Sequence, residues 1–357
     1  MKRIALVALT LLLGMLVMPA HSQEETVAAG VYVPAMTLPP QVRLEGLRPI
    51  YQQLNRCSSA ALTIQLSYFG WSGTYDDSIR ALNPHLEDVA VRLDEMTRFV
   101  EAQGLRAIER VGGTLDLLKA LVANGFPVLV EAVYYDGPDA FKDWMSHNRV
   151  IMGYDDAQQV LLSYDSLLGN GEDNTGRPIP YADVDERWRA FNRDYMVIYR
   201  PEEEERLQAV MGPLWDPQAA AEQALAQSMA ELETPYADSF TVFNAGSSLV
   251  LLGRHEEAAE YFDRARGTGL PWRMLWYMYG PFEAYLAVGR YDDVLQMARD
   301  VIATTPGVEE AYYYAGMAYE ALGEQQRARA NYEVAVMRNN GFTQAVAALG
   351  RLAAAGG

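Results

Sequence analysis

The last third of the chain repeats itself, and this repetition restricts the possible folds more than any other feature of the sequence. Three glycines stand in similar surroundings at intervals of 36 and 34 residues: Leu252-Gly253-Arg254, Val288-Gly289-Arg290 and Leu322-Gly323-Glu324. After each glycine, apolar residues follow at helical spacing, beginning at Ala258, Val294 and Ala328. A glycine turn in a unit of about 34 residues predicts two helices that bury their apolar faces only against a neighbouring unit.

A small residue stands seven positions before the turn glycine in two of the units, as Gly246 and Gly316, whereas Phe282 occupies this position in the middle unit. With this period and these residues, the segment resembles the tetratricopeptide repeat family, whose unit is a helical hairpin. The resemblance implies an all-α tetratricopeptide-repeat solenoid over residues 238–357, with a terminal capping helix from Phe342 to Leu352. Residues 202–237 are predicted to form a helical linker that leads into it.

Aromatic residues of the array are candidates for binding a peptide. If the first helices of the hairpins line a concave face, as they do in the family, that face includes Phe240, Phe243, Trp276, Tyr279, Glu283, Tyr313 and Met317. Aromatic side chains are common anchors at such surfaces, which singles out Phe243, Trp276, Tyr279 and Tyr313. The alternative is that each of these rings packs between repeats, and the sequence leaves both readings open.

The first 22 residues have the pattern of an export signal. Lys2 and Arg3 form a charged start, Ile4 to Met18 is apolar, and small residues at Ala20 and Ser22 suit cleavage after Ser22. We therefore expect a secreted or extracytoplasmic protein. No later apolar run reaches the ~18 residues of a membrane-spanning helix, so no transmembrane segment is expected after signal removal.

The charge balance excludes one class of partner. The chain has 29 Lys and Arg against 47 Asp and Glu, a net charge of -18. Such acidity repels phosphate backbones, so nucleic acid is not expected as a partner.

Residues 46–201 are predicted to form an α+β domain, preceded by a Pro- and Gly-punctuated linker or strap over residues 23–45. Helices are expected first, at Cys57–Phe69 ending at Gly70, at Val91–Gln103, and from the N-cap Thr114 to Gly125. Strands are expected afterwards, at Phe126–Tyr135, Asn148–Tyr154, Val160–Tyr164 and Tyr195–Tyr199, with a hairpin turn at Asp155–Ala157. Helices followed by a sheet are typical of an α+β fold.

Cys57 is the only cysteine, so a disulfide within the chain is impossible. One reading is a buried small hydrophobe, as many lone cysteines are. The other is a reactive thiol, because Cys57 stands at the predicted start of a helix, where the partial positive charge of the helix N-terminus favours the thiolate.

His147 is the histidine placed best to serve Cys57. His85 is expected in a loop and His255 in a solvated repeat turn, whereas His147 lies at the mouth of the predicted hairpin. If Asp156 is the middle residue of the turn, His147 faces Asp165 directly across the two strands, where the carboxylate can accept the imidazole Nδ1–H. The alternative is an ordinary cross-strand pair at the surface.

At these residues the chain resembles a known family. The segments that carry the likeness are Tyr51-Gln52-Gln53-Leu54-Asn55-Arg56-Cys57, Ser67-Tyr68-Phe69-Gly70-Trp71, Trp144-Met145-Ser146-His147, Gly153-Tyr154-Asp155-Asp156, Tyr164-Asp165-Ser166 and Gly169. Together they are similar to the bacteriocin-processing type of papain-like cysteine peptidase. The resemblance implies Cys57 as nucleophile, His147 as general base, Asp165 as its orienting partner and Gln52 as an oxyanion donor, with Gln53 as a less favoured alternative.

The chain departs from the family pattern at two places. Ser58-Ser59 follows the cysteine where the family usually has Gly-Pro, and Asn148 follows the histidine where an aromatic residue is common. These changes leave open whether the domain cleaves. No metal or other cofactor is expected, since the sequence has neither a His-Glu-x-x-His motif nor paired cysteines.

These observations predict a papain-like cysteine peptidase domain followed by a repeat solenoid. The predicted function is hydrolysis of a peptide bond in a peptide or protein substrate through a Cys-His-Asp triad, with the repeats holding a protein or peptide partner. The alternative is a papain-like fold without catalysis that binds proteins through its repeats.

Overall fold

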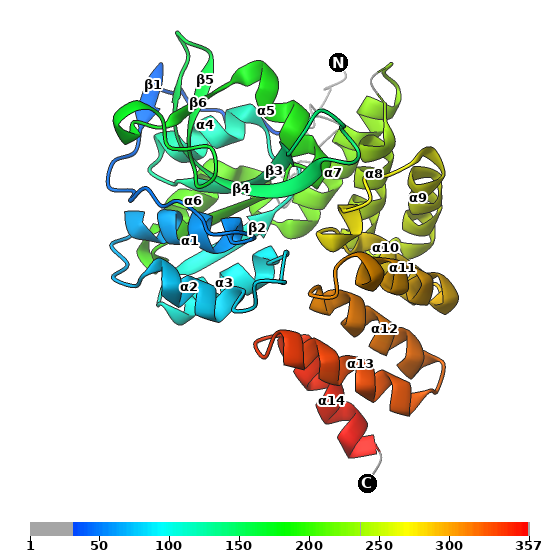
Figure 1. Cartoon of the computed structure of the whole chain (residues 1–357). Coiled ribbons are helices and arrows are strands. Elements are labelled where there is room, and N and C mark those ends of the chain that lie inside the picture. The colour runs from blue at the N-terminus through cyan, green and yellow to red at the C-terminus, as the bar shows by residue number, and fades with distance from the viewer. Residues whose placement is uncertain (1–30, 236, 356–357) are drawn as a thin grey trace, which may run out of the picture. The chain divides into compact units, whose positions relative to one another are not determined.

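The computed structural model describes residues 31–235 and 237–355 (Figure 1). The predicted export signal, residues 1–22, and the first part of the predicted linker lie outside these residues. Within the described ranges, no helix combines the length and the apolar character needed to cross a membrane.

A seven-stranded antiparallel sheet forms the centre of the first domain. Six strands follow the order β2-β7-β3-β4-β5-β6, and β1 pairs with one end of β4. The strands are β1 (Gln41–Arg43), β2 (Arg106–Arg110), β3 (Val128–Tyr135), β4 (Trp144–Asp155), β5 (Val160–Asp165), β6 (Arg177–Pro180) and β7 (Tyr195–Tyr199). The long central strands β3 and β4 are buried on both faces over most of their length, which suits the Val-rich start of β3 and the apolar run Val150-Ile151-Met152 of β4.

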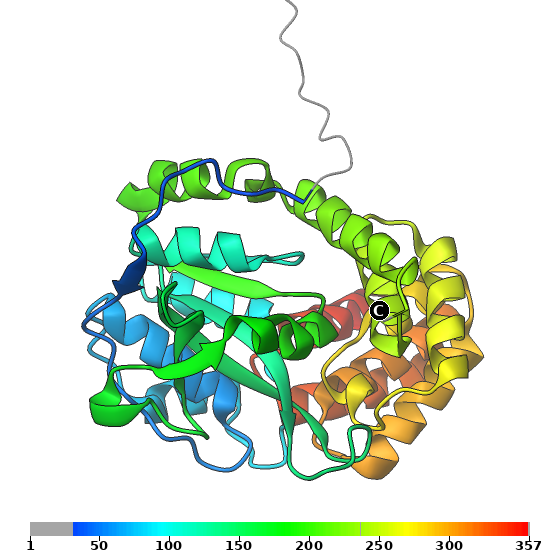
Figure 2. The ribbon, with the colours of Figure 1, turned by 90° about the horizontal axis from the view of Figure 1, so that it is seen from above.

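Helices cover both faces of this sheet. One face packs against α1 (Cys57–Tyr68), α2 (Tyr75–Leu82) and α3 (Leu93–Ala102), and the other packs against α4 (Leu115–Ala123), α5 (Tyr181–Trp188) and α6 (Glu204–Met211). Figure 2 shows the strands between α4 and α6 on one side and the blue helix α1 on the other. Every residue of α1 from Ser58 to Ser67 is buried, so the start of this helix is held firmly against the sheet.

The three predicted helices and the predicted strands of this domain are present close to their expected bounds. Thr114 caps α4 as expected, with its side-chain oxygen accepting from the Leu117 N–H at 3.0 Å. The elements α2, α5, β1, β2 and β6 were not predicted from the sequence. Helix α2 begins with a capping box, in which Thr74 and Asp77 each accept a hydrogen bond from the other's backbone N–H.

Residues 31–45 lie across the domain as a strap and are not a free linker. Besides the pairing of β1 with β4, the Tyr154 hydroxyl donates to the Pro39 carbonyl at 2.7 Å. The Tyr32 N–H donates to Gln223 Oε1 at 2.6 Å.

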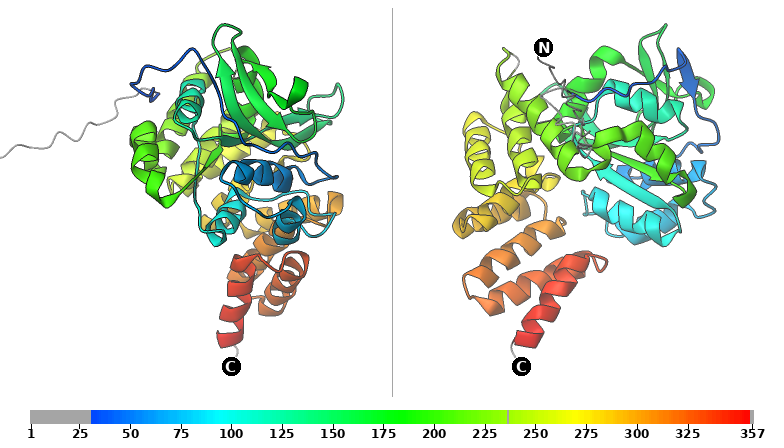
Figure 3. Two further views of the ribbon diagram at one scale, coloured as in Figure 1. Left: turned by 90° about the vertical axis from the view of Figure 1, so that its left-hand side faces the viewer. Right: turned by 180° about the vertical axis from the view of Figure 1, so that it is seen from behind.

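The rest of the chain is helical. After α6 come α7 (Pro217–Leu232) and the hairpins α8 (Ser239–Leu251) with α9 (His255–Thr268), α10 (Gly280–Ala287) with α11 (Tyr291–Thr304), and α12 (Glu309–Ala321) with α13 (Gln325–Arg338), followed by α14 (Thr343–Ala355). Figure 3 shows the hairpins following one another from α8 to α14. The structure therefore has an α+β domain followed by an all-α array of helical hairpins, which confirms the predicted fold class.

The small residues of the repeat have a packing role. A Cβ added at Gly246 would lie 2.8 Å from the Phe262 ring, and one at Gly316 would lie 2.5 Å from the Tyr332 ring. Both glycines therefore let the two helices of a hairpin approach closely. The middle unit fills the same position with Phe282, whose fully buried ring stacks on Tyr314 with centroids 5.0 Å apart.

The array packs against the α+β domain near both of its ends. Near its start, Trp144 of β4 is fully buried and stacks between Phe191 and Phe240, at centroid distances of 5.2 and 6.2 Å. Near its end, Arg338 pairs with Glu87 at 2.8 Å. The hydrophobic cluster of the array includes Val133, Trp144, Ala190 and Phe191 of the first domain, so the array is well placed to contribute to a site on that domain.

Candidate active site

Cys57 is the first residue of α1, as predicted. The chain enters this helix through a tight turn in which the Arg56 N–H donates to the Gln53 carbonyl at 3.2 Å and Asn55 takes a left-handed conformation with φ of 59°. The first turn of α1, Cys57-Ser58-Ser59-Ala60, carries no acidic side chain that would oppose a thiolate. The position at the helix N-terminus therefore favours the ionised sulfur.

His147 and Asp165 meet, although not in the predicted register. His147 Nε2 lies 2.8 Å from Asp165 Oδ1, and the two side chains are 2% and 0% exposed. Asp165 is directly opposite Arg149, and the residue opposite His147 on β3 is Ala132. The prediction of direct opposition was wrong because the turn comprises residues 156–159 and an irregularity between Ile151 and Gly153 shifts the pairing again.

The ring nitrogen assigned to the carboxylate was also wrong. Nε2 faces Asp165, which leaves Nδ1 for the thiol of Cys57. Asp165 Oδ1 also accepts from the backbone N–H groups of Leu167 and Leu168, at 3.0 and 2.7 Å. The carboxylate is thus held by its own loop, and it in turn fixes the orientation of the imidazole.

Opposite charges follow one another through this site. Burial raises the pKa of the Cys57 thiol, but the hydrogen bond and charge of His147 and contacts from Asn148 lower it more, so the pKa lies below its ordinary value. Burial lowers the pKa of His147, but hydrogen bonds and charges of Asp165 and Cys57 raise it to about 9. These shifts favour a thiolate beside an imidazolium at neutral pH.

Asp165 stays ionised in this environment. Burial raises its pKa, but the hydrogen bond and charge of His147, the charge of Arg149 and the Leu168 N–H lower it to about 2. Arg149 Nε lies 3.0 Å from Asp165 Oδ2 on the side away from the histidine contact. This buried arginine was not predicted from the sequence, although a charged residue directly before the apolar run Val150-Ile151-Met152 was a usable signal.

Gln52 lies beside Cys57 in the cleft, whereas Gln53 is exposed outside it. The Ser166 hydroxyl donates to Gln52 Oε1 at 2.7 Å, and the Gln52 N–H donates to the Ser166 carbonyl at 3.0 Å. These bonds fix the amide with its oxygen occupied, so its NH2 group is the part that remains to donate. Of the two glutamines, only Gln52 lines the cleft that contains Cys57.

The two departures from the family pattern are in contact with each other. Asn148 Nδ2 donates to Ser58 Oγ at 3.0 Å and lies 3.9 Å from Cys57 Sγ. An amide donor thus stands beside the sulfur, where it stabilises negative charge, and the serine holds the amide in place. Ser59 points elsewhere and donates to Asn83 Oδ1 at 2.6 Å.

Cys57 and His147 open into a cleft of about 630 Å³ that has walls from both parts of the chain. The α+β domain supplies one wall with Gln52, Cys57, Ser146 and His147. The array supplies the other with Arg273, Trp276, Tyr277, Thr304, Thr305 and Pro306. A substrate at Cys57 would therefore touch the array.

The four aromatic residues proposed for peptide binding have different surroundings. Trp276 lines the Cys57 cleft, and its indole N–H donates to Thr304 Oγ1 at 3.1 Å. Phe243 is fully buried against Phe262, so its assignment to a binding surface was wrong. Tyr279 is buried outside this cleft, and Tyr313 packs against Tyr332 and Phe342.

Tyr277 is a cleft residue that the sequence analysis missed. Its ring is tilted against that of Trp144 at a centroid distance of 5.9 Å, and burial, followed by the charge of Cys57, raises the pKa of its hydroxyl. It follows η5 (Met274–Trp276), a short turn of helix that interrupts the repeat pattern between α9 and α10. The repeat period does not predict such an insertion, which explains the omission.

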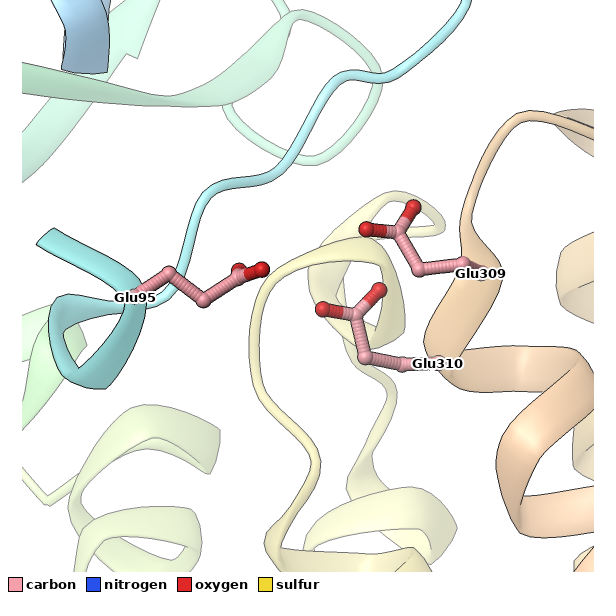
Figure 4. A group of neighbouring side chains, drawn as sticks. All are labelled: Glu95, Glu309 and Glu310. Carbon is pink, nitrogen blue, oxygen red and sulfur yellow. The ribbon is translucent and has the colours of Figure 1, made fainter. Parts of the chain in front are cut away.

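The described residues contain one cluster of side chains with the chemistry of a metal site, formed by Glu95, Glu309 and Glu310. Glu95 belongs to α3, and Glu309 and Glu310 begin α12 (Figure 4).

Comparisons with known proteins bear on both parts of the chain. Xylellain, a cysteine protease from Xylella fastidiosa, shares 17% identity over 47% of this chain and 90% of its own, with a TM-score of 0.36. A double glycine motif protease from an AMS/PCAT transporter, solved in complex with the leader peptide, shares 14% identity over 44% of this chain and 94% of its own, with a TM-score of 0.33. MamA 41-end from Desulfovibrio magneticus RS-1 shares 22% identity over 37% of this chain and 74% of its own, with a TM-score of 0.34.

No curated protein matches the chain. The family model described as Peptidase_C39 like family matches residues 45–196. That range includes Gln52, Cys57, His147 and Asp165, so the segment that builds the α+β wall of the cleft is similar to this family.

Proposed function

We propose that this chain is an exported cysteine peptidase that hydrolyses a peptide bond with Cys57, His147 and Asp165. The observation that carries the proposal is their succession in space. Thiol, imidazole and carboxylate come from α1, β4 and β5, and they meet at the floor of a cleft in the order that nucleophilic catalysis requires.

In the first step the Cys57 thiolate attacks the carbonyl carbon of the scissile peptide bond. The electron pair of the C=O bond moves to oxygen, and the resulting oxyanion accepts hydrogen bonds from the Gln52 NH2 group and the Cys57 backbone N–H. The His147 imidazolium then gives its Nδ1 proton to the leaving amine as the C–N bond breaks. The products of this step are a free amine and a thioester on Cys57.

In the second step His147 acts as a base. It takes a proton from a water molecule, whose oxygen attacks the thioester carbonyl, and the same donors hold the second oxyanion. Collapse of that intermediate expels the Cys57 thiolate and releases the carboxylic acid. Asp165 remains ionised throughout and stabilises the imidazolium each time it forms.

The substrate class follows from the cleft. Three leucines at its edge, Leu54, Leu86 and Leu167, are 70%, 53% and 42% exposed, although exposed large apolar side chains are usually scattered. Trp276 and Tyr277 face them from the array. We propose that a peptide segment with apolar side chains binds between the leucines and the two aromatic rings, which also gives the array its role as a peptide-binding partner.

The proposed location outside the cytoplasm rests on the charged, apolar and small-residue pattern of residues 1–22. It is tested by N-terminal sequencing of the protein recovered from its native host, with a start near Gln23 as the expected result.

The Cys57→Ala variant tests the reaction. Because the sulfur is the nucleophile, the variant should lose all cleavage of a peptide library and all labelling by a thiol-reactive peptide electrophile. Its melting temperature should stay within a few degrees of wild type, since Cys57 is half-buried and alanine suits a helix start. Cleavage is measured by mass spectrometry of the products, which also identifies the bond that is cut.

Ser72→Ala is the matched control, since Ser72 is exposed and lies outside the cleft. It should cleave and label as wild type does. Equal turnover by wild type and Cys57→Ala would contradict the proposed reaction.

A further inference from the structure

A group of buried carboxylates lies at the contact between the α+β domain and the array. Glu95 of α3 is 7% exposed, and Glu309 and Glu310, the first residues of α12, are each 1% exposed. Each offers an oxygen, and these oxygens lie within 4.8 Å of one another. Figure 4 shows Glu95 reaching from its helix toward Glu309 and Glu310.

The positive charge near these carboxylates is too small to balance them. Arg92 NH1 is 3.6 Å from Glu310 Oε1, but the same guanidinium also holds Asp94 through bonds of 2.8 and 3.0 Å. Two uncharged donors reach the cluster: the Asn339 amide donates to Glu95 Oε1 at 2.8 Å and Glu309 Oε1 at 2.7 Å, and the Arg92 backbone N–H donates to Glu95 Oε2 at 3.1 Å. An amide satisfies hydrogen bonds but brings no charge.

A fourth buried carboxylate adds to the negative charge around these glutamates. Asp88, in the loop between α2 and α3, is 2% exposed, and among the described residues nothing donates a hydrogen bond to its Oδ2. Burial and then the charge of Glu310 raise its pKa.

Several oxygens of the group lack a donor. Within residues 31–235 and 237–355, no hydrogen bond reaches either oxygen of Glu310 or Oε2 of Glu309. The Tyr279 hydroxyl is a neighbour of Glu310, but it donates to the Trp276 carbonyl at 2.6 Å. Buried anionic oxygens without donors are costly unless a cation balances them.

We propose that Glu95, Glu309 and Glu310 bind a divalent cation, Ca²⁺, between the two parts of the chain. Ca²⁺ prefers carboxylate oxygens at about 2.3–2.6 Å, so two of its ligands can stand up to about 5 Å apart. Oxygens separated by as much as 4.8 Å fit this span. They fit Mg²⁺ less well, because its ligands at about 2.1 Å are at most about 4.2 Å apart.

The site would join the array to the first domain near the proposed active site. Glu309 stands three positions after Pro306, and the segment Thr304–Pro306 forms part of the array wall of the Cys57 cleft. Between them, Gly307 packs so closely on the first domain that a Cβ there would lie 1.9 Å from the Glu87 carbonyl oxygen. A cation held by Glu95, Glu309 and Glu310 would therefore hold this wall in place. The proposal does not depend on whether Cys57 cleaves peptides.

Calcium binding by the purified full-length protein tests the proposal. The protein is treated with a chelator, and CaCl2 or MgCl2 is then added in calorimetric titrations and in thermal melts. We expect saturable binding of one Ca²⁺ per chain and a rise in melting temperature of several degrees, with a much smaller response to Mg²⁺. Hydrogen exchange at residues 304–312 should slow when Ca²⁺ is added.

The Glu310→Gln variant separates binding from folding. Glutamine keeps the shape and removes one charge, so the calcium-free variant should melt at or above the temperature of calcium-free wild type. Its affinity for Ca²⁺ should fall at least about tenfold. Glu333→Gln on α13, which removes an exposed carboxylate of the same array, should bind Ca²⁺ as wild type does.

Two outcomes would overturn the proposal. Wild type without a saturable response to CaCl2, together with a more stable Glu310→Gln variant, would show that protons alone neutralise the cluster. An equal response in wild type and Glu310→Gln would show that Ca²⁺ binds the acidic surface in general.

Discussion

Two groups of buried ionisable side chains in this molecule solve the same electrostatic problem differently. The catalytic cluster, Cys57, His147, Asp165 and Arg149, alternates in charge from thiolate to guanidinium. The carboxylate cluster, Asp88, Glu95, Glu309 and Glu310, has four acids near two arginines, Arg56 and Arg92, and Arg92 is shared with Asp94. Both clusters lie where helices contact neighbouring segments of the chain, and the side chains of both clusters are buried or half-buried.

The comparison shows which compensating charge each cluster needs in order to remain buried. In the catalytic cluster each charge stabilises the next, so the pKa of Asp165 falls to about 2 and that of His147 rises to about 9. In the carboxylate cluster, burial and then neighbouring charge raise the pKa values of Asp88, Glu309 and Glu310. The first cluster is neutral by itself, whereas the second requires a proton or a cation from outside.

Of the changes considered, replacing Asp165 with Asn should reduce the rate of peptide cleavage most, because it removes the negative charge that lies between His147 and Arg149. The amide can donate to His147 Nε2, which leaves the proton on Nδ1, where it cannot accept one from Cys57. By analogy with other triads, the rate of peptide cleavage should fall by about 10³- to 10⁴-fold. Arg149, whose side chain is 8% exposed, would keep a buried charge without its partner, at a cost of about 3 kcal/mol or more.

Asp155→Asn in the β4–β5 turn is the matched control for this change. The Asp155 side chain caps the turn by accepting from the N–H groups of Ala157 and Gln158, a task that asparagine also performs. Steady-state kinetics and chemical denaturation measure both variants. Retention of full stability by Asp165→Asn would show that Arg149 does not depend on this carboxylate.

The pH dependence of stability should distinguish a paired thiol from an isolated histidine. Unfolded thiols and imidazoles titrate near pH 8.5 and 6.5. Between these values the unfolded pair carries one proton on sulfur, and the folded pair carries one on His147, so folding takes up no proton and stability stays level. Stability falls below about pH 6.5, where the unfolded pair gains a second proton, and above about pH 8.5, where it loses both.

The Cys57→Ala variant should lack the pH range in which stability stays constant. Only His147 then titrates, and its pKa remains raised by Asp165. Its contribution is complete below about pH 6.5 and is lost as pH rises, with a slope of at most about 1.4 kcal/mol per pH unit. Scanning calorimetry of both proteins from pH 6 to 9 tests this, and parallel curves would contradict a thiolate–imidazolium pair.

The meeting of His147 and Asp165 shows what a strand pattern can and cannot predict. Asp165 was expected opposite His147 but lies opposite Arg149, two residues further along β4. A register shift of two residues leaves every side chain on the same face of the sheet. His147 therefore remains a diagonal neighbour that can reach the carboxylate. The face follows from alternation along the strand, whereas the register depends on a turn and a bulge with no clear local signal.

A similar limit applies to the repeats. The 34- and 36-residue intervals predict the hairpins and their turn glycines, because each follows from local spacing. Phe243 is buried against Phe262 of the same hairpin, whereas the exposure of Trp276 to the cleft depends on what lies next to the array. That neighbour is the α+β domain, whose placement against the array results from contacts such as Trp144 with Phe240, more than ninety residues apart in sequence.

Of the changes considered, loss of the contact between Asn148 and Ser58 should have the smallest effect, and that effect is on the reactivity of Cys57. Asn148→Ala removes the amide 3.9 Å from Cys57 Sγ, so the pKa of the thiol should rise. The backbone N–H of Asn148, which also lowers that pKa, remains in the variant. We therefore expect alkylation of Cys57 at pH 6 to slow by only about fivefold, equivalent to about 1 kcal/mol.

A double-mutant cycle shows whether the two departures act together. Since Ser58 Oγ holds the amide by a bond of 3.0 Å, Ser58→Ala should lose part of the same effect, and adding it to Asn148→Ala should change the alkylation rate little more. The pH profile of alkylation measures each variant. Additive effects would mean that Asn148 reaches the sulfur without Ser58, and an unchanged profile in Asn148→Ala would leave His147 as the main side chain that lowers the thiol pKa.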